Sequence, residues 1–481
     1  MPLSNDQIIA QNPWWGDPSW RVRDRQLTRL AAQPMRLPAR PVDAIELRRA
    51  GIHVLRGPRQ VGKSTDLKLL VERALAEGYP PRAVVYLTLD LIEGEQHAAL
   101  ADAVVRAKAL ARHAGPSLVL LDEVTGVPRW QTAVKACWDD GTIGDDVVLC
   151  TGSSAIDLQS GAAERLPGRR GAGVDHLILP QTFASFAHAV HSSLPPSPGL
   201  TVGELRTPDG EAAIHEARLH DRALRDALSL YLRFGGLPAA VAEAATGGIE
   251  PSERVRRVLY DSLIKEIQRR GASIPAAHAL LERVLRSLGS NTDWSKLARE
   301  LDVPLGRRGG TTSHHTLRDY IELLAGGYFL FILYFWRADS ETNSLSNEKK
   351  VFFADPLLHT IALELAPGLS PDAAALVENA VGLALYRRYE RSQRLIESFV
   401  SPDHLHAWRT AGDRETDFVA GPRRTRDVVE VKYRRHIDRR TATGVVRAHP
   451  GRPVVLATQD TLDFAESYAL IPVHILLWAL G

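Results

Sequence analysis

The sequence predicts an α/β protein that begins with a parallel sheet covered by helices, continues through a helical region and ends in a second α/β domain. Three observations predict this order. Apolar strands alternate with helices from Gly51 to Thr151, helical periodicity dominates residues 223–324, and strands return from Val351. A chain of 481 residues is long enough for about three domains of ordinary size.

Changes in composition divide the chain into four segments. The first is rich in Trp, Arg and Pro without a sustained period, which predicts an extended arm. A stretch rich in Pro, Ser and Gly at residues 192–199 indicates the end of the first α/β domain. We expect an N-terminal arm at 1–45, a sheet domain at 46–195, a helical and winged-helix-like region at 196–345, and an α/β domain at 346–481.

Short apolar runs and amphipathic segments define the elements of the first domain. Runs without polar alternation are typical of strands buried on both faces, as in a parallel sheet. Strands are predicted at 51–55, 83–89, 117–121 and 146–151, and helices at 63–77, 97–114 and 130–139.

The later elements follow the same two patterns. Helices are predicted at 223–231, 255–268, 278–288, 294–301, 314–324 and 374–389, and strands at 328–334, 405–408, 416–420, 427–431 and 453–457.

Composition and charge exclude several classes of protein. Hydrophobic residues make up 44% and charged residues 24%, which is ordinary globular usage and excludes a disordered chain. The net charge of +2 gives no general indication of nucleic-acid binding. Cys137 and Cys150 lack metal-ligand spacing and cannot form a disulfide framework, which predicts a reducing cytoplasm. No signal peptide or membrane span is expected, because the longest aromatic-aliphatic run, 328–336, is too short.

A phosphate-binding loop joins the first strand to the first helix. Its pattern is Gly57-Pro58-Arg59-Gln60-Val61-Gly62-Lys63-Ser64, and Thr65 follows in the helix. Backbone N–H groups would cradle the phosphates of ATP, Lys63 would neutralise the β and γ oxygens, and Ser64 would bind Mg²⁺. The alternative is a glycine turn without a ligand.

The third strand supplies the acids that such a site needs. It ends in Asp122-Glu123, where Asp122 would hold Mg²⁺ through water and Glu123 would orient or deprotonate the attacking water. The next strand ends in Thr151-Gly152-Ser153-Ser154, whose hydroxyls, that of Ser153 among them, could contact the γ-phosphate. Turn formation explains the same residues almost as well.

These motifs, in this order, resemble the prokaryotic AAA-type ATPases whose C-terminal half is a domain of unknown function with a nuclease-like fold. The match extends to Leu166-Pro167-Gly168-Arg169-Arg170, Leu179-Pro180-Gln181-Thr182-Phe183 with Phe186, and Gly235-Gly236-Leu237-Pro238. The resemblance implies that Arg169, or its neighbour Arg170, is an arginine finger that reaches the γ-phosphate of a neighbouring subunit. It thereby implies a homo-oligomer such as a hexameric ring, whereas the alternative is a surface-loop arginine.

The helical region contains a pattern typical of a helix-turn-helix. Residues 297–303 and 313–324 could place His314, His315 and Arg318 toward DNA, as in a winged helix. The second helix carries as many acids as bases, which favours the alternative, packing between the two α/β domains.

The last domain has the residues of a metal-dependent phosphodiesterase. Glu378 lies in a predicted helix, Asp417 in a strand, and Glu430 and Lys432 share one face of the next strand because residues two apart do so. Such carboxylates can hold Mg²⁺ or Mn²⁺ while lysine supports the attacking hydroxide. The set resembles the PD-(D/E)XK nuclease core, a restriction-endonuclease-like fold, although Thr416 replaces the usual proline.

Two features qualify and support this interpretation. Glu348-Lys349-Lys350 also satisfies the Glu-x-Lys pattern, but only the later one follows a predicted strand and the Glu378 helix. Basic residues that could bind the phosphates of DNA surround the later pattern: Arg423, Arg424, Arg426, Arg434, Arg435, Arg439 and Arg440.

The sequence therefore predicts an ATPase, using ATP and Mg²⁺, coupled to a DNA-directed nuclease domain that acts in repair, branched-DNA processing or defence. The alternative is a non-cleaving regulatory ATPase whose degenerate nuclease fold binds a protein or a nucleic acid.

Overall fold

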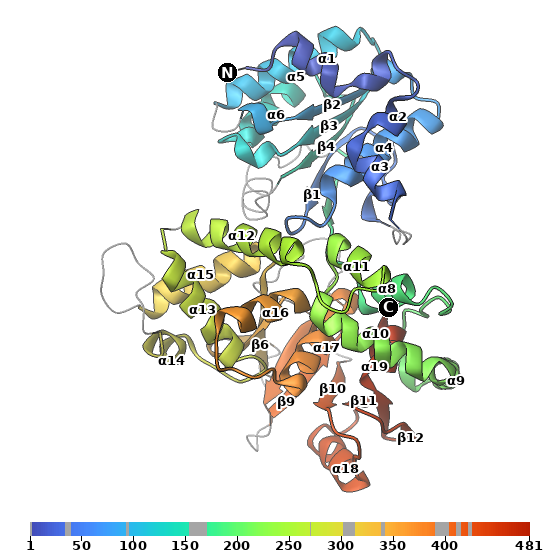
Figure 1. The fold of residues 1–481 in the computed structure, drawn as a ribbon, viewed down its shortest axis with the longest axis vertical. Coiled ribbons are helices and arrows are strands. Elements are labelled where there is room, and N and C mark those ends of the chain that lie inside the picture. The colour runs from blue at the N-terminus through green and yellow to red at the C-terminus, as the bar shows by residue number, and fades with distance from the viewer. Residues whose placement is uncertain are drawn as a thin grey trace. The chain divides into compact units, whose positions relative to one another are not determined.

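The computed structural model describes residues 2–33, 40–92, 96–152, 171–269, 271–301, 313–337, 342–389, 404–409, 415–421 and 426–481. The chain forms two compact units, Met1–Leu179 (unit 1) and Pro180–Gly481 (unit 2), as Figure 1 shows. In the described part of the chain, every helix is too short or too polar to cross a membrane.

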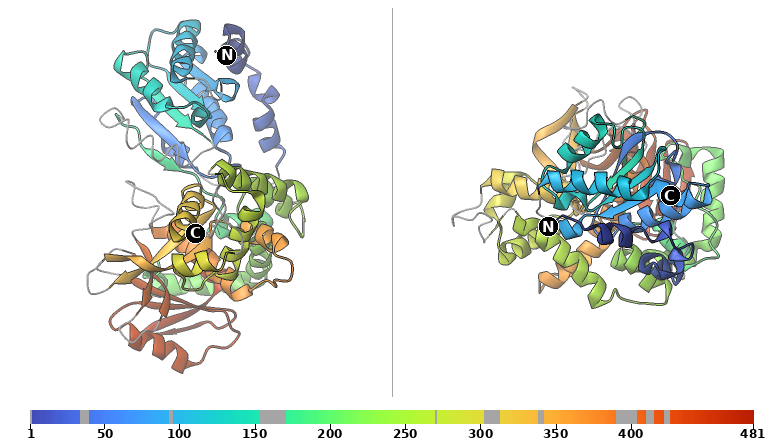
Figure 2. Two further views of the ribbon diagram at one scale, coloured as in Figure 1. Left: turned by 90° about the vertical axis from the view of Figure 1, so that its left-hand side faces the viewer. Right: turned by 90° about the horizontal axis from the view of Figure 1, so that it is seen from above.

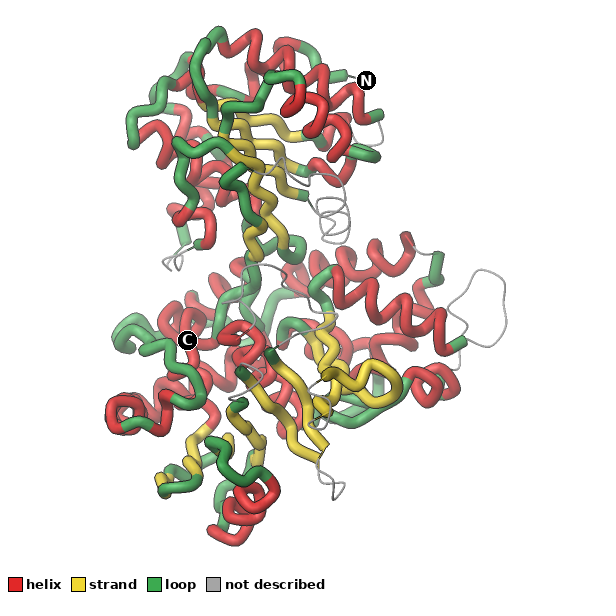
Figure 3. The backbone as a smooth tube through the Cα atoms, turned by 180° about the vertical axis from the view of Figure 1, so that it is seen from behind, coloured by secondary structure: helices red, strands yellow, loops and turns green. Residues whose placement is uncertain are grey.

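A parallel sheet forms the centre of unit 1 (Figure 3). Its order is β2-β3-β4-β1-β5, and every described pair of neighbours is parallel. The four predicted strands of this domain are confirmed to within one or two residues. The strands are β1 (Gly51–Arg56), β2 (Val84–Thr88), β3 (Leu118–Asp122), β4 (Val147–Thr151) and β5 (Asp175–Leu177).

Helices cover both faces of this sheet (Figure 2). Successive strand residues point to opposite faces, so Val54 packs with one layer of helices and Leu55 with the other. The helices are α1 (Asn5–Gln11), α2 (Trp20–Arg23), α3 (Arg25–Ala31), α4 (Lys63–Ala76), α5 (His97–Ala111) and α6 (Trp130–Asp139). Helices α1, α5 and α6 share one layer, and α3 and α4 share the other.

The N-terminal segment is not an extended arm, because its described part folds into helices against the sheet. The side-chain amide of Asn12 pairs with the backbone N–H (2.7 Å) and C=O (2.9 Å) of Tyr86 on the edge strand β2. Gln11 pairs with Thr88 in the same way. The indole N–H groups of Trp14 and Trp15 both donate to the Val84 carbonyl. These side chains satisfy an edge that would otherwise be open to another strand.

A mixed sheet forms the centre of unit 2. Its described order is β12-β13-β11-β10-β9-β8-β6-β7. The strands are β6 (Leu330–Arg337), β7 (Thr342–Phe353), β8 (Leu405–Arg409), β9 (Glu415–Ala420), β10 (Asp427–Lys432), β11 (Val454–Thr458), β12 (Asp463–Ala465) and β13 (Tyr468–Pro472). Because β6 and β7 belong to this sheet, part of the expected helical region at 196–345 joins the last α/β domain.

Helices lie on both faces of the second sheet. Gly382 of α17 (Ala373–Tyr389) lies against the Phe418 ring of β9. On the other face, Ala442 and Val445 of α18 (Arg439–Ala448) pack with Val428 of β10. The other described helices are α8 (Phe183–Val190), α9 (Pro208–Ala217), α10 (Asp221–Phe234), α11 (Pro238–Ala245), α12 (Glu253–Arg269), α13 (Ile274–Arg286), α14 (Trp294–Arg299), α15 (His314–Gly326), α16 (Pro356–Leu365) and α19 (Val473–Leu480).

The Gly-Gly-Leu-Pro turn connects α10 to α11, and both glycines are required by close approaches. Gly235 has φ +66°, and a Cβ there would clash with the carboxylate of Asp355. A Cβ on Gly236 would clash with the Gln181 carbonyl. Asp355 in turn accepts a hydrogen bond from the Gly236 N–H at 2.8 Å. The turn therefore fastens two distant segments of unit 2.

Candidate functional site

The predicted phosphate loop lies between β1 and α4. Three of its residues have left-handed backbone conformations: Gly57 (φ +146°), Gln60 (φ +64°) and Gly62 (φ +98°). The Lys63 side chain crosses the loop, and its Nζ donates to the carbonyls of Gly57 and Pro58, both at 2.9 Å. Gly62 caps the N-terminus of α4 without a side-chain hydrogen bond, so backbone N–H groups of the first turn face the loop.

Asp122 lies at the end of β3, where it meets the loop. Its carboxylate accepts hydrogen bonds from the Ser64 side chain and from the Tyr86 hydroxyl at 2.8 Å. Burial raises the pKa of Asp122, whereas these two hydrogen bonds lower it. Ser64 and Asp122 thus bring together two oxygen ligands of the kind that Mg²⁺ prefers.

Burial lowers the pKa of Lys63 to about 8, and the charges of Glu123 and Asp122 oppose that shift. The site thus collects one ammonium and two carboxyl groups at the ends of adjacent elements. Glu123 has φ +57°, an uncommon conformation for a residue other than glycine, and such strain clusters at functional sites.

Thr151 adds a hydroxyl to the same edge of the sheet. Strand β4, which it ends, lies between β1 and β3. Its Oγ1 is buried and has no hydrogen-bond partner among the described residues. A buried hydroxyl beside the phosphate loop can donate to a phosphate oxygen or a water.

Arg40 supports the loop from the N-terminal segment. Its Nη2 donates to the Val61 carbonyl at 2.9 Å and pairs with Asp66 of α4 at 2.8 Å. Both charged side chains are nearly fully buried. Sequence reasoning missed this residue, because one arginine in an Arg-rich segment carries no local signal.

Several predicted residues of this site lie outside the described part of the chain. They are Ser153, Ser154, Arg169 and Arg170.

The predicted nuclease residues of unit 2 converge from three elements. Asp417 lies on β9, and its backbone N–H donates to Glu430 Oε2 on β10 at 3.3 Å. The Val431 N–H donates to Asp417 Oδ2 at 2.8 Å. Lys432 Nζ pairs with Glu430 Oε1 at 2.6 Å. Glu378 of α17 faces Asp417, whose charge helps to raise the Glu378 pKa.

Lys350 lies at the centre of this cluster, although the local context favoured the later Glu-x-Lys pattern over its own. Its Nζ is 2.9 Å from Glu378 Oε1, 2.8 Å from Glu415 Oε1 and 3.1 Å from Asp417 Oδ1. Antiparallel pairing of β7 with β6 places Lys350 opposite Leu333, inside the sheet. The residue was missed because it lies just before Val351, where strands were predicted to return, and because it meets the acids only through the fold.

The electrostatics of the cluster reflect burial of several charges together. Burial raises the pKa of Glu378 to about 8, with Asp417 adding to the shift and Lys350 opposing it. Burial also raises the pKa of Glu430. For Lys350 burial acts to lower the pKa, but Asp417, Glu378 and Glu415 outweigh it and raise the pKa above its usual range.

The arrangement does not fit a divalent metal ion. The ammonium of Lys350 is within hydrogen-bond distance of Glu378 and Asp417, two of the three predicted metal ligands, and of Glu415 beside them. Among the described residues, no group of three His, Cys, Asp or Glu side chains is arranged to hold a metal ion.

The basic residues near the cluster differ in exposure. Arg426 is buried with its guanidinium carbon 3.9 Å from the Trp336 ring centroid. It therefore does not contribute to the basic surface that the sequence predicted. Arg423 and Arg424 lie outside the described residues. Four arginines are exposed around the end of β10 and the start of α18: Arg434, Arg435, Arg439 and Arg440.

The predicted DNA-reading helix is α15. His314 and His315 are exposed and their ring centroids lie 4.0 Å apart, whereas Arg318 pairs with Glu322 at 2.7 Å. The partner of Arg318 reduces the positive charge that this helix could present to phosphates. The turn before α15 falls largely outside the described residues.

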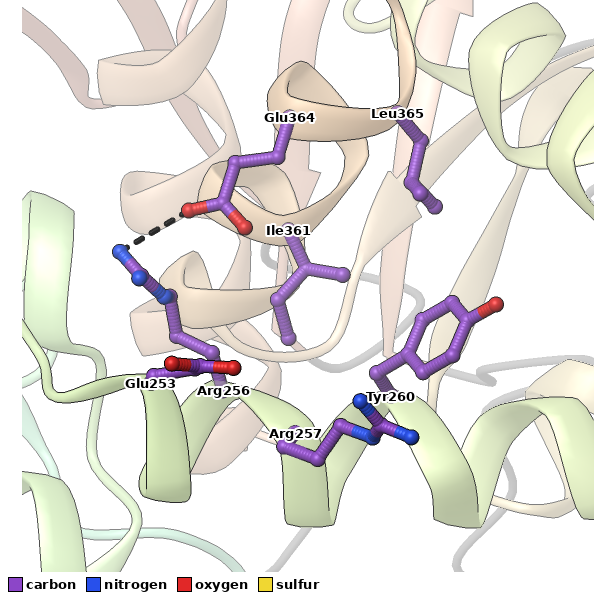
Figure 4. A pocket seen from close by; sticks show the side chains of 7 residues that line it. All are labelled: Glu253, Arg256, Arg257, Tyr260, Ile361, Glu364 and Leu365. Atoms are coloured by element: carbon purple, nitrogen blue, oxygen red, sulfur yellow. Dashed lines mark ion pairs between the residues drawn. The ribbon is translucent and has the colours of Figure 1, made fainter.

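A further pocket of about 200 Å³ lies between α12 and α16 (Figure 4). Arg256 and Glu364 pair across it at 2.9 Å. Its volume is below the roughly 300–1,000 Å³ typical of ligand sites. The remaining lining residues are Glu253, Arg257, Tyr260, Ile361 and Leu365.

Comparison with known proteins identifies two families along the chain. Residues 49–187 match the family described as AAA domain, and residues 225–367 match one described as Domain of unknown function (DUF8612). None of the curated proteins compared with the chain matches it. The first match covers most of unit 1 and supports the prediction of an AAA-type P-loop ATPase domain there.

The solved structures that match the chain are distant from it. The Aeropyrum pernix ORC2 protein, in ADPNP–ADP complexes, is 14% identical, covers 66% of this chain and 88% of its own, and has a TM-score of 0.32. The Aeropyrum pernix ORC1 protein in complex with DNA is 18% identical, with 74% and 97% covered and a TM-score of 0.29. C. elegans PCH-2 is 12% identical, with 55% and 75% covered and a TM-score of 0.29.

Proposed function

We propose that unit 1 binds ATP with Mg²⁺ and hydrolyses it. The observation that supports this most directly is the contact between Ser64 and Asp122, beside the buried ammonium of Lys63. The contact joins the end of β3 to the helix that follows β1, as a phosphate site with a metal requires.

The residues divide the chemistry among them. Residues 57–65 hold the phosphates through backbone N–H groups and Lys63, and Ser64 and Asp122 hold Mg²⁺. When bound, Mg²⁺ neutralises charge on the β and γ oxygens. Glu123 orients the attacking water and accepts its proton, and Thr151 fixes a phosphate oxygen or the water.

The experiment is to measure nucleotide binding and ATP hydrolysis separately. Lys63→Ala should abolish binding, whereas Glu123→Gln should keep binding and lose at least tenfold in hydrolysis rate, because only the base is removed. Lys135→Ala, which removes a lysine of α6 outside the phosphate-loop motif, is the matched control. Hydrolysis by Lys63→Ala at the wild-type rate would refute the assignment.

Assembly follows from the same proposal. Arg169 or Arg170 supplies an arginine finger to a neighbouring copy in a homo-oligomer such as a hexameric ring. The ATPase rate per subunit then rises with protein concentration until assembly is complete. A flat rate in a monomeric sample counts against a finger that acts between subunits.

For unit 2 we propose DNA as the partner, and two activities are supported by different observations. Metal-dependent cleavage with Mg²⁺ or Mn²⁺ would use Glu378, Asp417 and Glu430, which converge with Lys432 beside them, but it would require that Lys350 leave the cluster. The position of Lys350 supports the alternative, binding without cleavage. The helices before the cluster, including the winged-helix-like segment with α15, would contribute to DNA contact or to packing.

Labelled linear, forked and four-way DNA distinguishes the two activities. Cutting with Mg²⁺ or Mn²⁺ that is lost in Glu430→Ala and responds to Lys63→Ala supports a coupled nuclease. DNA binding without cutting, in protein that hydrolyses ATP, supports the non-cleaving alternative. The ATPase measurement above is independent of this result.

A further inference from the structure

A single ammonium group satisfies three carboxylates in the interior of unit 2. The Lys350 side chain is 1% exposed, and its Nζ contacts Glu378, Glu415 and Asp417 at 2.8–3.1 Å. A protonated lysine has three N–H donors, so these contacts use its full hydrogen-bonding capacity. Glu378 comes from α17, and Glu415 and Asp417 both come from β9.

We propose that the Lys350 ammonium is the resident cation of this carboxylate cluster, standing where a nuclease would hold a divalent metal ion, so that unit 2 binds DNA without metal-dependent cleavage. The part of this proposal that concerns DNA rests on the proposed function of unit 2. The part that concerns the metal ion depends only on the contacts within unit 2.

The two cations exclude each other on distance and charge. Mg²⁺ lies about 2.0–2.1 Å from its oxygen ligands, so an ion bound to the same oxygens would lie within a few ångströms of Nζ. Repulsion between a divalent ion and an ammonium at that separation is large in a buried site. A metal ion therefore enters only if the Lys350 side chain leaves.

Removal of the ammonium should convert the cluster into a metal site. Deleting one partner of a buried ion pair leaves uncompensated charge, which strongly favours any replacement cation. The variant Lys350→Ala leaves both space and three carboxyl groups. It should therefore bind Mn²⁺ at the place that the Lys350 ammonium occupies in the wild-type protein.

The neighbouring Lys349 provides a matched control. Successive strand residues face opposite sides, and Lys349 is buried with its Nζ 4.1 Å from the Trp294 ring centroid. No carboxylate is within ion-pair distance of its Nζ among the described residues. Lys349→Ala therefore removes a buried lysine from the same strand without opening the carboxylate cluster.

The experiment is calorimetric titration of the nucleotide-free full chain with Mn²⁺, in a Lys63→Ala background that silences the phosphate site. We expect Lys350→Ala to bind one Mn²⁺ per chain at least tenfold more tightly than the Lys349→Ala control, and to lose that binding when Glu378→Gln is added. Equal, weak binding by the Lys350 and Lys349 variants would overturn the proposal.

A second comparison applies even if Lys350→Ala does not fold. Asp417→Asn is compared with its parent chain, with lysine still at position 350. Equal Mn²⁺ binding by the two supports the proposal, whereas loss of a Mn²⁺ site in Asp417→Asn overturns it. Neither ATP nor DNA is present, so failure of the ATPase or DNA assignment gives a different result from failure of this one.

Discussion

Two hydroxyl groups orient the Asp122 carboxylate. Ser64 belongs to the phosphate loop, whereas Tyr86 lies on β2, and its hydroxyl donates to Asp122 Oδ2 at 2.8 Å. The Tyr86 ring is itself fixed by Lys68, whose Nζ lies 3.8 Å from the ring centroid and 3.7 Å from Asp24. The N-terminal segment is thereby linked to the proposed Mg²⁺ ligand.

Tyr86→Phe tests this support. The variant keeps the ring beneath Lys68 and removes one hydrogen bond to a charged group, worth roughly 1.5–3 kcal/mol. We expect the Mg²⁺ concentration for half-maximal ATPase activity to rise at least roughly tenfold, with a smaller change in kcat. Tyr79→Phe is the control, because its hydroxyl bonds the Leu47 carbonyl elsewhere in unit 1. Equal half-saturation in both variants would contradict the role of Tyr86.

Residues that form a local pattern could be predicted, and residues that arrive through the fold could not. Lys63, Ser64 and Asp122 follow strands in recognisable motifs, so spacing alone indicated their proximity. Arg40 and Lys350 contact their sites across long sequence separations. Arg40 lies in no distinctive local pattern, and the Glu-x-Lys pattern of Lys350 lacked the local context that favoured the later one.

At the scale of elements, hydrophobic periodicity was sufficient where a segment is buried on both faces. The strands β1 to β4 are such runs and were predicted nearly to the residue. The N-terminal segment was misjudged as extended, because Asn12 and Trp14 pair with backbone atoms of β2 rather than following a period. Strand β7 was missed because the predicted return of strands began only at Val351.

The turn between α10 and α11 gives a prediction at this scale. Gly235 and Gly247 both have positive φ, but a Cβ clashes with Asp355 only at Gly235, while Gly247 faces open space. Gly247→Ala should lower the free energy of unfolding by about 1–2 kcal/mol through backbone strain alone. Gly235→Ala should lower it by at least about 3 kcal/mol, since steric overlap adds to that strain. Urea unfolding of the two variants measures the difference, and equal costs would show that the Asp355 contact is unimportant.

At the scale of the whole molecule, each unit has the parts of an independent folding domain. Unit 1 contains its own sheet with a hydrophobic layer on each face, and unit 2 contains a separate sheet whose core includes residues of α18. The candidate ATP site is built within unit 1 and the Lys350 cluster within unit 2. Ligands and substitutions should therefore act first on the unit that contains them.

Calorimetric melting of the full chain tests this independence. We expect two unfolding transitions, and ATP with Mg²⁺ should raise the midpoint temperature of only one of them. At a nucleotide concentration of about 100 times Kd, ligand binding adds roughly 2.7 kcal/mol, or about 5–10 °C for a unit of this size. Lys63→Ala should remove that shift, because it removes binding.

A complementary experiment uses Gly235→Ala, a substitution in unit 2. It should lower the midpoint temperature only of the transition that ATP leaves unchanged. Nucleotide and substitution would then act on different transitions of the same molecule, as separate cores require. A single transition that moves under both treatments would show instead that the two units unfold cooperatively. In that case, binding of ATP in unit 1 would stabilise the carboxylate cluster of unit 2 through a shared unfolding equilibrium, a coupling that neither core alone predicts.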